Sequence, residues 1–344
     1  MHDRRAWQQL GITEVAAETW RVPLTLPDAG LGAVNAYVVV DGDGIVVIDP
    51  GQAFTDATEQ LGAALDSIGF SLRNIRGCLI THVHLDHYTN AITLRRELGP
   101  DVWLGVHERP SLMLLSRPDE GRLGTLMPTL HRCGAGYLAD QLGAVNRGGD
   151  LPMDIWEEPD IWLEPGRQIA LSSRTLSVVH TPGHTQGHIV LHDAENALLF
   201  AGDHVLPDIT PSVGFEPIPG EAPLADYLSS LTQMLALDDA RLLPAHGPVR
   251  DSVHRRVDEL LDHHRLRLDA TAEQVAAGHR TVVEIARALR WTRRLVAVDS
   301  LDTLSQALAV LETKAHLDVL VALGRVEEDS SDGTLRYVPK RERR

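Results

Sequence analysis

The feature that most constrains the fold is a cluster of metal-type side chains placed directly after a short apolar run. Residues 79–90 read LITHVHLDHYTN, and three histidines and an aspartate fall between positions 82 and 87. The preceding GCLI has the character of a buried strand, and open α/β sheets bind their ligands at the carboxyl ends of strands. The stretch therefore predicts an α/β fold with a site at this strand end.

The residues around this motif alternate between strand and helix patterns. Residues 35–51 read as two β-branched strands joined at an Asp-Gly turn, and residues 55–70 have helical apolar spacing. A helix ending at Gly99, a strand at 101–106 and a hairpin turning near residues 194–196 continue the alternation. We predict an α/β domain over residues 1–252, which the motifs below indicate to be the one that carries the site.

A less regular segment, residues 108–160, interrupts this alternation and is interpreted as a helical insertion. Its apolar side chains either line a pocket or a subunit contact, or pack as an ordinary core within their own domain. They are Met113, Leu114, Leu115, Leu126, Met127, Leu130, Tyr137 and Leu138.

From Val253 onward the pattern changes to amphipathic helices. Helices are expected within residues 253–278, 281–289 and 303–324, followed by a polar hairpin at 325–339. Three helices and a hairpin are the element order of a winged-helix module, so residues 253–344 are predicted to form a small, mostly helical winged-helix-like domain.

Length, composition and charge fit this two-part organisation. The chain has 344 residues, with 43% hydrophobic and 23% charged residues, which is ordinary for soluble globular proteins of two domains. No secretory signal or membrane span is recognised, and a cytoplasmic location is expected. With two cysteines and no CxxC pair, a metal site must use histidine and carboxylate ligands.

The net charge of −16 arises from residues 1–253, because residues 254–344 carry nearly equal numbers of basic and acidic side chains. A surface of this sign repels phosphate backbones, which disfavours nucleic-acid partners. Among the basic residues arginine far outnumbers lysine, which is typical of a GC-rich bacterial genome.

Three further motifs place a histidine or aspartate after a predicted strand. They are HTPGHTQGH with His184, AGDH with Asp203, and PAHG with His246. Strand ends that converge would bring these side chains to the first motif, where two metal ions about 3.5 to 4 Å apart could share one hydroxide.

In this order, HVHLDH, TPGHTQGH, AGDH and PAHG resemble the metallo-β-lactamase superfamily, and its glyoxalase II-like hydrolases in particular, over about residues 20–250. The resemblance implies an αβ/βα sandwich with the site at one edge between the sheets. It implies that one metal ion is held by His82, His84 and His184, that the other is held by Asp86, His87 and His246, and that Asp203 bridges both. Asp49 would orient the motif loop without binding metal.

The remaining histidines are interpreted as structural. They include His107, His131, His180, His188, His192, His204, His263 and His264. Thr81, Thr181 and Thr185 are interpreted as hydroxyls that shape the loops.

The expected reaction is hydrolysis by a metal-bridging hydroxide that Asp86 positions, without a separate general base. Zinc is the expected metal, and iron and manganese accept the same ligands.

The preferred substrate is a thioester or ester of a medium-sized acyl group. The predicted winged-helix-like segment stands where glyoxalase II has a glutathione-binding helical domain, which disfavours glutathione thioesters. A CoA-type carrier could be contacted by Arg109, Arg117, Arg122, Arg132 and Tyr137. The C-terminal domain would serve as a lid or as the contact of a homodimer. A lactonase of the same fold is the nearest alternative. A nuclease or nucleic-acid-binding regulator is the alternative from a different class. The helix at 303–324, which would contact DNA in that case, has more acidic than basic side chains, and this disfavours the alternative.

Overall fold

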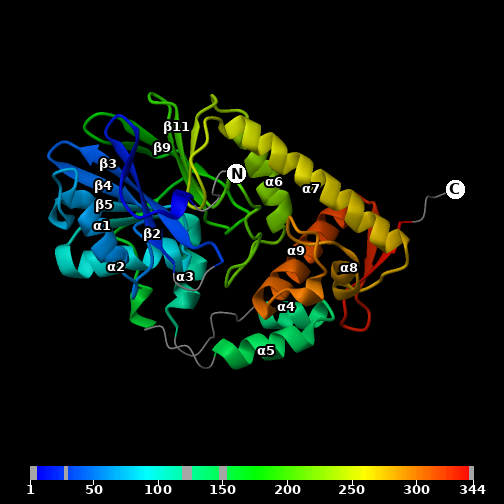
Figure 1. Cartoon of the computed structure of the whole chain (residues 1–344). Coiled ribbons are helices and arrows are strands. Elements are labelled where there is room, and N and C mark those ends of the chain that lie inside the picture. The colour runs from blue at the N-terminus through cyan, green and yellow to red at the C-terminus, as the bar shows by residue number, and fades with distance from the viewer. Residues whose placement is uncertain (1–5, 27–29, 118–125, 147–152, 341–344) are drawn as a thin grey trace.

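Two β-sheets face each other, and helices cover the outer face of each (Figure 1). The computed structural model describes residues 6–26, 30–117, 126–146 and 153–340. This arrangement is the αβ/βα sandwich of the predicted fold class. Among the described residues, no helix is long and apolar enough to cross a membrane.

The first sheet contains seven strands in chain order. Strands β1 to β4 pair antiparallel, and β4 to β7 pair parallel. The strands are β1 (Thr13–Ala16), β2 (Thr19–Thr25), β3 (Ala33–Asp41), β4 (Gly44–Ile48), β5 (Ile75–Ile80), β6 (Asp101–Gly105) and β7 (Ile161–Leu163). The hairpin predicted at the Asp-Gly turn is confirmed as β3 and β4.

The second sheet has the strand order β12-β11-β10-β9-β8, and only β11 and β12 are parallel. Its strands are β8 (Gln168–Ala170), β9 (Thr175–His180), β10 (Ile189–Asp193), β11 (Leu198–Gly202) and β12 (Arg241–Pro244). The hairpin predicted near residues 194–196 is confirmed as β10 and β11.

Side chains alternate between two apolar layers along the central strands, as the two-residue period of a strand requires. In β3, Val38 packs toward the helices on the outer face, whereas Val39 packs between the sheets. In β11, Leu199 packs outward and Phe200 packs between the sheets. Both faces of these strands are therefore buried, which holds their carboxyl ends in fixed positions.

Helices α1, α2 and α3 cover the first sheet, and α6 lies on the second sheet. The helices before residue 240 are α1 (Ala57–Asp66), α2 (Leu85–Leu98), α3 (Arg109–Leu115), α4 (Leu126–Arg132), α5 (Gly136–Asn146) and α6 (Pro223–Met234). Helix α2 ends, as predicted, at Gly99, which has a φ of 84° that glycine adopts without strain. Short 3-10 helices occupy Ala6–Gln8, Leu72–Asn74, Val106–Glu108, Met153–Ile155 and Val298–Ser300.

The C-terminal region has the predicted order of three helices and a hairpin. Its elements are α7 (Val253–Ala276), α8 (Val282–Ala288), α9 (Thr303–Ala322), β13 (Val326–Asp329) and β14 (Arg336–Pro339). The apolar core around α7 and α9 also contains Leu130 of α4, Leu138 of α5 and Leu231 of α6. The inserted helices therefore pack on the C-terminal helices (Figure 1), and the predicted boundary at Val253 stays a prediction.

Candidate metal centre

Seven side chains that can bind metal ions meet at one edge of the sandwich, where strands of both sheets end. Four come from the loop after β5 and the first turn of α2, and the other three follow β9, β11 and β12. They are His82, His84, Asp86, His87, His184, Asp203 and His246. The structure thus brings together every residue for which the sequence predicts metal binding.

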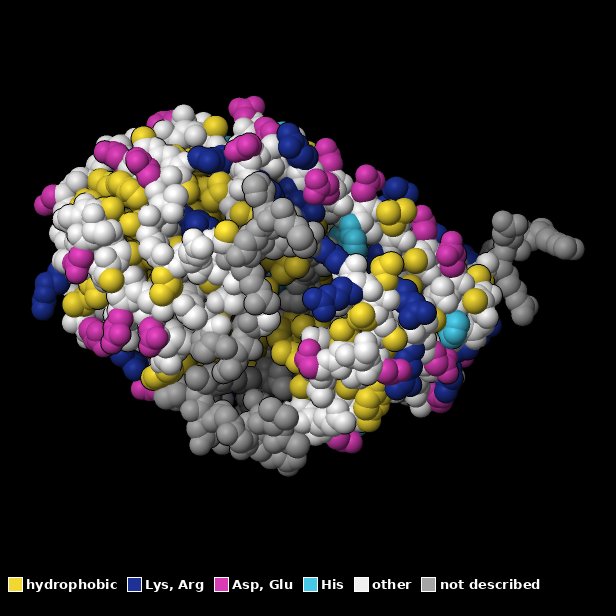
Figure 2. All heavy atoms as spheres, in the orientation of Figure 1, with side chains coloured by type: hydrophobic (Ala, Val, Ile, Leu, Met, Phe, Trp, Pro, Cys, Tyr) yellow, Lys and Arg dark blue, Asp and Glu magenta, His cyan; other side chains and the backbone are white. Residues whose placement is uncertain are grey.

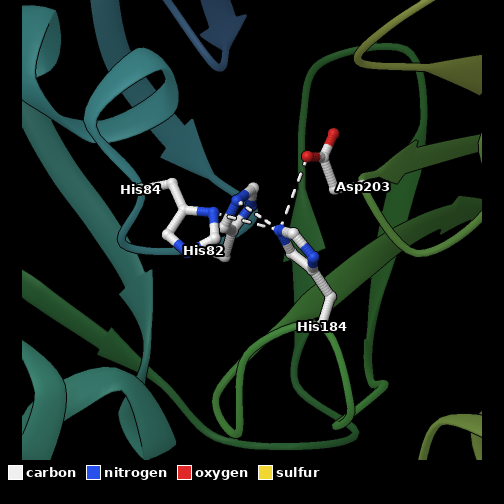
Figure 3. Close-up of side chains that lie close together, drawn as sticks. All are labelled: His82, His84, His184 and Asp203. Atoms are coloured by element: carbon white, nitrogen blue, oxygen red, sulfur yellow. Dashed lines mark hydrogen bonds and ion pairs between the residues drawn. The ribbon is translucent and has the colours of Figure 1, made fainter. Parts of the chain in front are cut away.

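The first group consists of three imidazoles and one carboxylate (Figure 3). Nε2 of His184 lies 3.2 Å from Nε2 of His82, 3.0 Å from Nδ1 of His84 and 3.4 Å from Oδ2 of Asp203. The four donor atoms all lie within 4.8 Å of one another. Three nitrogens and an oxygen that face a common point form a donor set suited to a divalent transition metal.

The second group lies beside the first and shares Asp203 with it. Nε2 of His246 lies 3.3 Å from Oδ2 of Asp86 and 3.4 Å from Oδ1 of Asp203. Nε2 of His87 lies 3.7 Å from Oδ2 of Asp86 and 3.9 Å from Oδ1 of Asp203. Asp203 therefore presents one carboxylate oxygen to each group, which is the geometry of a bridging ligand.

Backbone carbonyls fix the tautomers of two histidines in the first group. Nδ1 of His184 donates to the Ser212 carbonyl at 2.7 Å, and Nε2 of His84 donates to the Phe215 carbonyl at 3.0 Å. A carbonyl oxygen only accepts, so in the neutral rings the opposite nitrogens carry lone pairs. These lone pairs face each other at 3.0 Å, an arrangement that a cation between them would stabilise.

A hydrogen-bond chain fixes His82 in the same way. The Thr81 hydroxyl donates to Oδ2 of Asp49 at 2.8 Å, so it accepts from Nδ1 of His82 at 3.0 Å. The lone pair of His82 is then on Nε2, which is its nitrogen nearest to His184. Thr81 shapes the loop, as predicted, and also sets the tautomer of this histidine.

Both histidines of the second group are oriented through their Nδ1 atoms. His87 donates to Oδ2 of Asp49 at 2.9 Å, and His246 donates to the Ala33 carbonyl at 2.8 Å. Their Nε2 atoms, together with Oδ1 of Asp203, are buried without a hydrogen-bond partner in the part of the chain that the structure describes. Such orphaned atoms cost about 1–3 kcal/mol each. A metal ion would satisfy all three, so the residues present fit a two-metal site.

The electrostatics of the site agree with this fit. Burial and the neighbouring imidazoles lower the pKa of His82 and lower the pKa of His84 to about 3, so both rings are neutral, as metal ligands must be. Burial disfavours the charged form of His87, but Asp86 and Asp49 outweigh it and raise the pKa of His87 to about 10. This part of the site favours a positive charge, which a metal ion supplies.

Two residues that the sequence left without a site role position Asp203. Nε2 of His188 accepts from the Asp203 backbone N–H at 3.1 Å, and its Nδ1 donates to the Thr181 hydroxyl at 2.9 Å. Gly202 has a φ of 49°, and a Cβ there would lie 2.6 Å from Nε2 of His188. The signals available in the sequence were the last histidine of HTPGHTQGH and the glycine of AGDH.

An apolar cavity of about 200 Å³ opens beside the first group. The described residues that line it are Val83, His84, Leu85, Leu115, Leu126, Trp156, Phe215, Glu216 and Pro217. Leu115 and Leu126 of the insertion line this cavity, whereas Leu130 and Leu138 pack in the apolar core around α7 and α9. Val83, His84 and Leu85 belong to the HVHLDH motif. Trp156, Phe215, Glu216 and Pro217 lie outside every motif, so sequence reasoning missed them as lining residues.

Glu216 lines this cavity and interacts with a second buried acid, Glu108. Glu216 accepts from the Gln186 backbone N–H at 2.6 Å and from the Ser111 hydroxyl at 2.9 Å, and Glu108 accepts from the Thr185 hydroxyl. Burial raises the pKa of both carboxyl groups, and the charge of Glu108 raises the pKa of Glu216 further. The cavity wall therefore carries less negative charge than its sequence suggests.

The arginines predicted to contact substrate are dispersed. The Arg109 guanidinium lies 4.9 Å from the centre of the Trp162 ring and 4.0 Å from the Glu158 carboxylate. Arg117 is exposed just beyond α3, and Arg122 lies outside the described residues. Neither Arg109 nor Arg117 is among the residues that line the apolar cavity.

Arg132 and Tyr137 lie on α4 and α5, which pack against the C-terminal helices. Arg132 is exposed, and the Tyr137 hydroxyl accepts from Arg287 at 3.2 Å. Neither residue lines the apolar cavity, and contact of any of these residues with substrate stays a prediction.

The fold and the motif positions identify the family. The chain belongs to the metallo-beta-lactamase superfamily, whose family model matches residues 29–246. This match spans all seven side chains of the two groups. The family is one of metal-dependent hydrolases, and a His/Asp cluster suited to two metal ions is present here.

Several relatives are distant in sequence, and the names of two of them state an activity. The chain is 25% identical over 276 residues to a beta-lactamase-like protein 2 homolog of Caenorhabditis elegans, covering 78% of this chain and 76% of that protein. It is 27% identical over 212 residues to the hydroxyacylglutathione hydrolase GloC of Haemophilus influenzae, covering 60% and 82%. It is 25% identical over 227 residues to the atrochrysone carboxyl ACP thioesterase dmxR1 of Cryptosporiopsis sp., covering 66% and 53%.

Solved structures match nearly the whole chain. A beta-lactamase domain protein from Burkholderia ambifaria is 26% identical, with a TM-score of 0.75 over 95% of this chain and 93% of that one. A metallo-beta-lactamase family protein from Thermus thermophilus is 23% identical, with a TM-score of 0.76 over 95% of this chain and 100% of that one. At this identity the likeness supports a shared fold only. The likeness thus extends through the C-terminal region.

Proposed function

We propose that this protein is a two-metal hydrolase that cleaves the thioester of a medium-sized acyl group. The single observation that carries the proposal is the apolar cavity beside His84, because it places room for an acyl chain next to the metal-binding side chains. Its lining is almost entirely apolar, and ligand sites of this kind combine hydrophobic walls with few polar groups.

The seven clustered side chains would hold the ions: His82, His84 and His184 on one, Asp86, His87 and His246 on the other, and Asp203 on both. Two bound divalent ions would lower the pKa of a shared water and polarise the substrate carbonyl. Zinc is our preferred metal, since histidine and carboxylate ligands suit it.

The chain's own residues orient these groups and admit substrate. Asp49 holds the first-motif loop by accepting from the Thr81 backbone N–H at 2.9 Å, from the Thr81 hydroxyl and from His87. Asp86 is partly exposed beside the second group, and we assign it the orientation of the attacking water. Hydrolysis forms a carbon–oxygen bond, breaks the carbon–sulfur bond and releases a carboxylic acid and a thiol.

Two of the distant relatives support the choice of a thioester. Hydroxyacylglutathione hydrolase and ACP thioesterase are both names of thioester-cleaving enzymes. At identities of 27% and 25%, these relatives support the cleavage of a thioester bond, and they do not indicate which acyl group or which thiol forms the substrate.

The experiment is a substrate panel on purified, metal-loaded protein. Acyl-CoA, acyl-glutathione and acyl-homoserine lactone substrates with matched acyl chains would be compared by kcat/KM. We expect turnover of thioesters, with a preference for medium chains that Trp156→Ala shifts toward longer ones. Lactone turnover without thioester turnover would overturn the proposed substrate and leave a lactonase.

The alternative from a different class is tested in parallel. Gel shifts with DNA and cleavage of single-stranded RNA at physiological salt would reveal a nuclease or regulator. We expect neither, because the net charge of −16 opposes binding to phosphate backbones. The winged-helix character of residues 253–344, and their role as a lid or homodimer contact, remain part of this proposal.

A further inference from the structure

A second, larger cavity lies away from the apolar one, where the segment after β11 meets the C-terminal helices. Its volume is about 480 Å³, and residues 208–210, helices α7 and α9 and the turn after α8 contribute to its lining. Figure 2 shows basic side chains gathered beside apolar ones on the face over α7 and α8. The function proposed above uses none of these residues.

The charge of this cavity differs from that of the protein as a whole. Among the described residues that line it, the arginines are Arg256, Arg267, Arg290 and Arg293, and the acids are Asp208 and Glu312. Burial raises the pKa of Glu312, and the neighbouring Arg267 guanidinium opposes this shift. An excess of arginine in a chain with a net charge of −16 is a local feature that attracts anions.

Several of these guanidinium groups have hydrogen-bonding capacity left over. Arg267 is mostly buried, and its Nη2 atom has no hydrogen-bond partner among the described residues. Arg290 is exposed and forms no ion pair within the described ranges. Nη2 of Arg293 lies 3.7 Å from Asp208, a carboxylate that Arg250 approaches more closely at 3.1 Å. Guanidinium forks bind phosphate oxygens in pairs, so this arrangement suits a phosphate group.

Apolar surface lies next to the arginines. Ile209 is 44% exposed and Leu295 is 69% exposed, although both line the cavity. The Arg267 guanidinium lies over the Trp291 ring, 3.9 Å from its centre, which favours a fixed position for this cation at the cavity wall. A ligand with both a planar ring and phosphate groups would cover this apolar surface and meet the guanidinium groups together.

We infer that this cavity is a binding site for a nucleotide, with its phosphates on Arg267, Arg290 and Arg293 and its base on Ile209 and Leu295. The ligand is either the nucleotide part of an acyl carrier or a free nucleotide. Binding as such does not depend on the proposed thioesterase activity.

One segment connects this cavity with the metal centre. Arg256 of α7 holds its start by donating to the Leu206 carbonyl at 2.6 Å and to the Ile209 carbonyl at 3.0 Å. A few residues further on, the Ser212 and Phe215 carbonyls orient the metal-site histidines. A nucleotide in the cavity would therefore contact the same segment that positions metal ligands.

The test is isothermal titration calorimetry of the full chain with ADP, adenosine and pyrophosphate at about 0.1 M salt. Phosphates also bind metal ions, so the titration is repeated after EDTA treatment. We expect ADP to bind with or without metal and adenosine to bind at least tenfold more weakly. Absence of ADP binding at millimolar concentration, or binding that EDTA abolishes, would overturn the inference.

Matched variants locate the site. Arg290→Gln combined with Arg293→Gln should weaken ADP binding at least tenfold. Arg294→Gln makes the same change at an exposed neighbour outside the cavity lining and should alter binding less than twofold. Circular dichroism checks that each variant is folded. Equal weakening by Arg294→Gln, or none by the double variant, would contradict the assignment.

Kinetics then distinguish the two sources of the nucleotide. If the cavity binds the carrier, the double variant raises KM for acyl-CoA at least tenfold relative to KM for the same acyl group on N-acetylcysteamine, which lacks phosphate. If a free nucleotide is the ligand, ADP changes turnover of both substrates, and the double variant loses this response. A protein inactive on every thioester would refute the proposed function while leaving the binding result intact.

Discussion

Two buried histidine clusters lie in different parts of the fold, one at the edge of the sandwich and the other between α7 and α9, and only the first fits metal ions. At the metal centre, backbone carbonyls and Asp49 take up the N–H groups, so the remaining lone pairs face inward. Between α7 and α9, Nδ1 of His316 donates to the Glu312 carbonyl at 2.7 Å, and its Nε2 lies 3.2 Å from Nδ1 of His264. In this second cluster, one ring donates and the other accepts, which is an ordinary hydrogen bond between neutral imidazoles.

The difference teaches that a high density of histidines does not by itself indicate a metal site. Within the described ranges, no third histidine, cysteine or carboxylate donor completes a site around His264 and His316. At the metal centre, two aspartates supply negative charge, and each imidazole uses one ring nitrogen for a hydrogen bond and directs the other inward. The comparison can be tested by variants of each cluster. Three variants change the carboxylates or histidines of the metal centre and its surroundings, and one removes the buried pair His264 and His316.

The largest effect is expected for Asp203→Ala, because this residue presents one oxygen to each group. Both ions should be lost, and kcat/KM should fall by more than the roughly 100-fold typical of removing a partner outside the ligand set. Metal content per chain, measured by plasma mass spectrometry, checks the loss. Asp251→Ala, at an exposed aspartate, is the control. Two ions retained per chain in Asp203→Ala would contradict the bridging role.

The next effect is expected for His246→Ala, which removes a ligand from the second group alone. Metal content should fall from two ions toward one, because the His82, His84 and His184 group keeps its donors. Titration of metal-free protein with zinc should show one tight and one weakened site. His254→Ala, on the surface side of α7, should keep both. Equal weakening of the two sites would argue against separate groups.

A smaller effect is expected for Asp49→Asn, because Asp49 is not one of the seven clustered side chains. It acts on the site through its hydrogen bond with His87. An amide would place a donor where the Asp49 oxygens now accept from Thr81 and His87. Outer partners of this kind are worth about 10- to 100-fold in metal affinity. Competition with a chelator measures the change. Unaltered affinity would show that Asp49 does not set the His87 tautomer.

The fold and the clustering of the candidate ligands were predictable because the motifs that carry the family resemblance are local in the sequence. The apolar run before His82, the Asp-Gly turn of β3 and β4, and the histidine or aspartate after each strand end are all contiguous patterns. Convergence follows from the sandwich, since strand ends at one edge lie close together.

The rest depends on contacts that leave no local pattern. The carbonyls of Ser212, Phe215 and Ala33 set three tautomers, but any residue type has a carbonyl. Trp156 and Phe215 meet at the apolar cavity from segments far apart in the chain. The packing of α4 and α5 on α9 likewise could not be predicted. The apolar residues of a helix indicate that one face is buried, but they do not indicate which other helix covers it.

His264→Leu combined with His316→Leu should have the smallest effect on metal binding. The same double variant should clearly change how the stability of the fold depends on acid pH. Burial and the neighbouring histidine lower the pKa of His264, and burial lowers the pKa of His316 to about 4. Both groups therefore stabilise the fold above the unfolded pKa near 6.5, and this contribution is lost as pH falls toward the folded values.

Urea unfolding of EDTA-treated protein at pH 7 and pH 5 measures this contribution. Between these values the wild type should lose free energy of unfolding more steeply than the double variant, by up to about 1.4 kcal/mol per pH unit for each histidine. His131→Leu, at an exposed histidine of α4, should keep the wild-type slope. Metal content should equal that of the wild type in both. Lost metal would mean that the two clusters are coupled, and an unchanged pH slope would mean that His264 and His316 are not buried as a neutral pair.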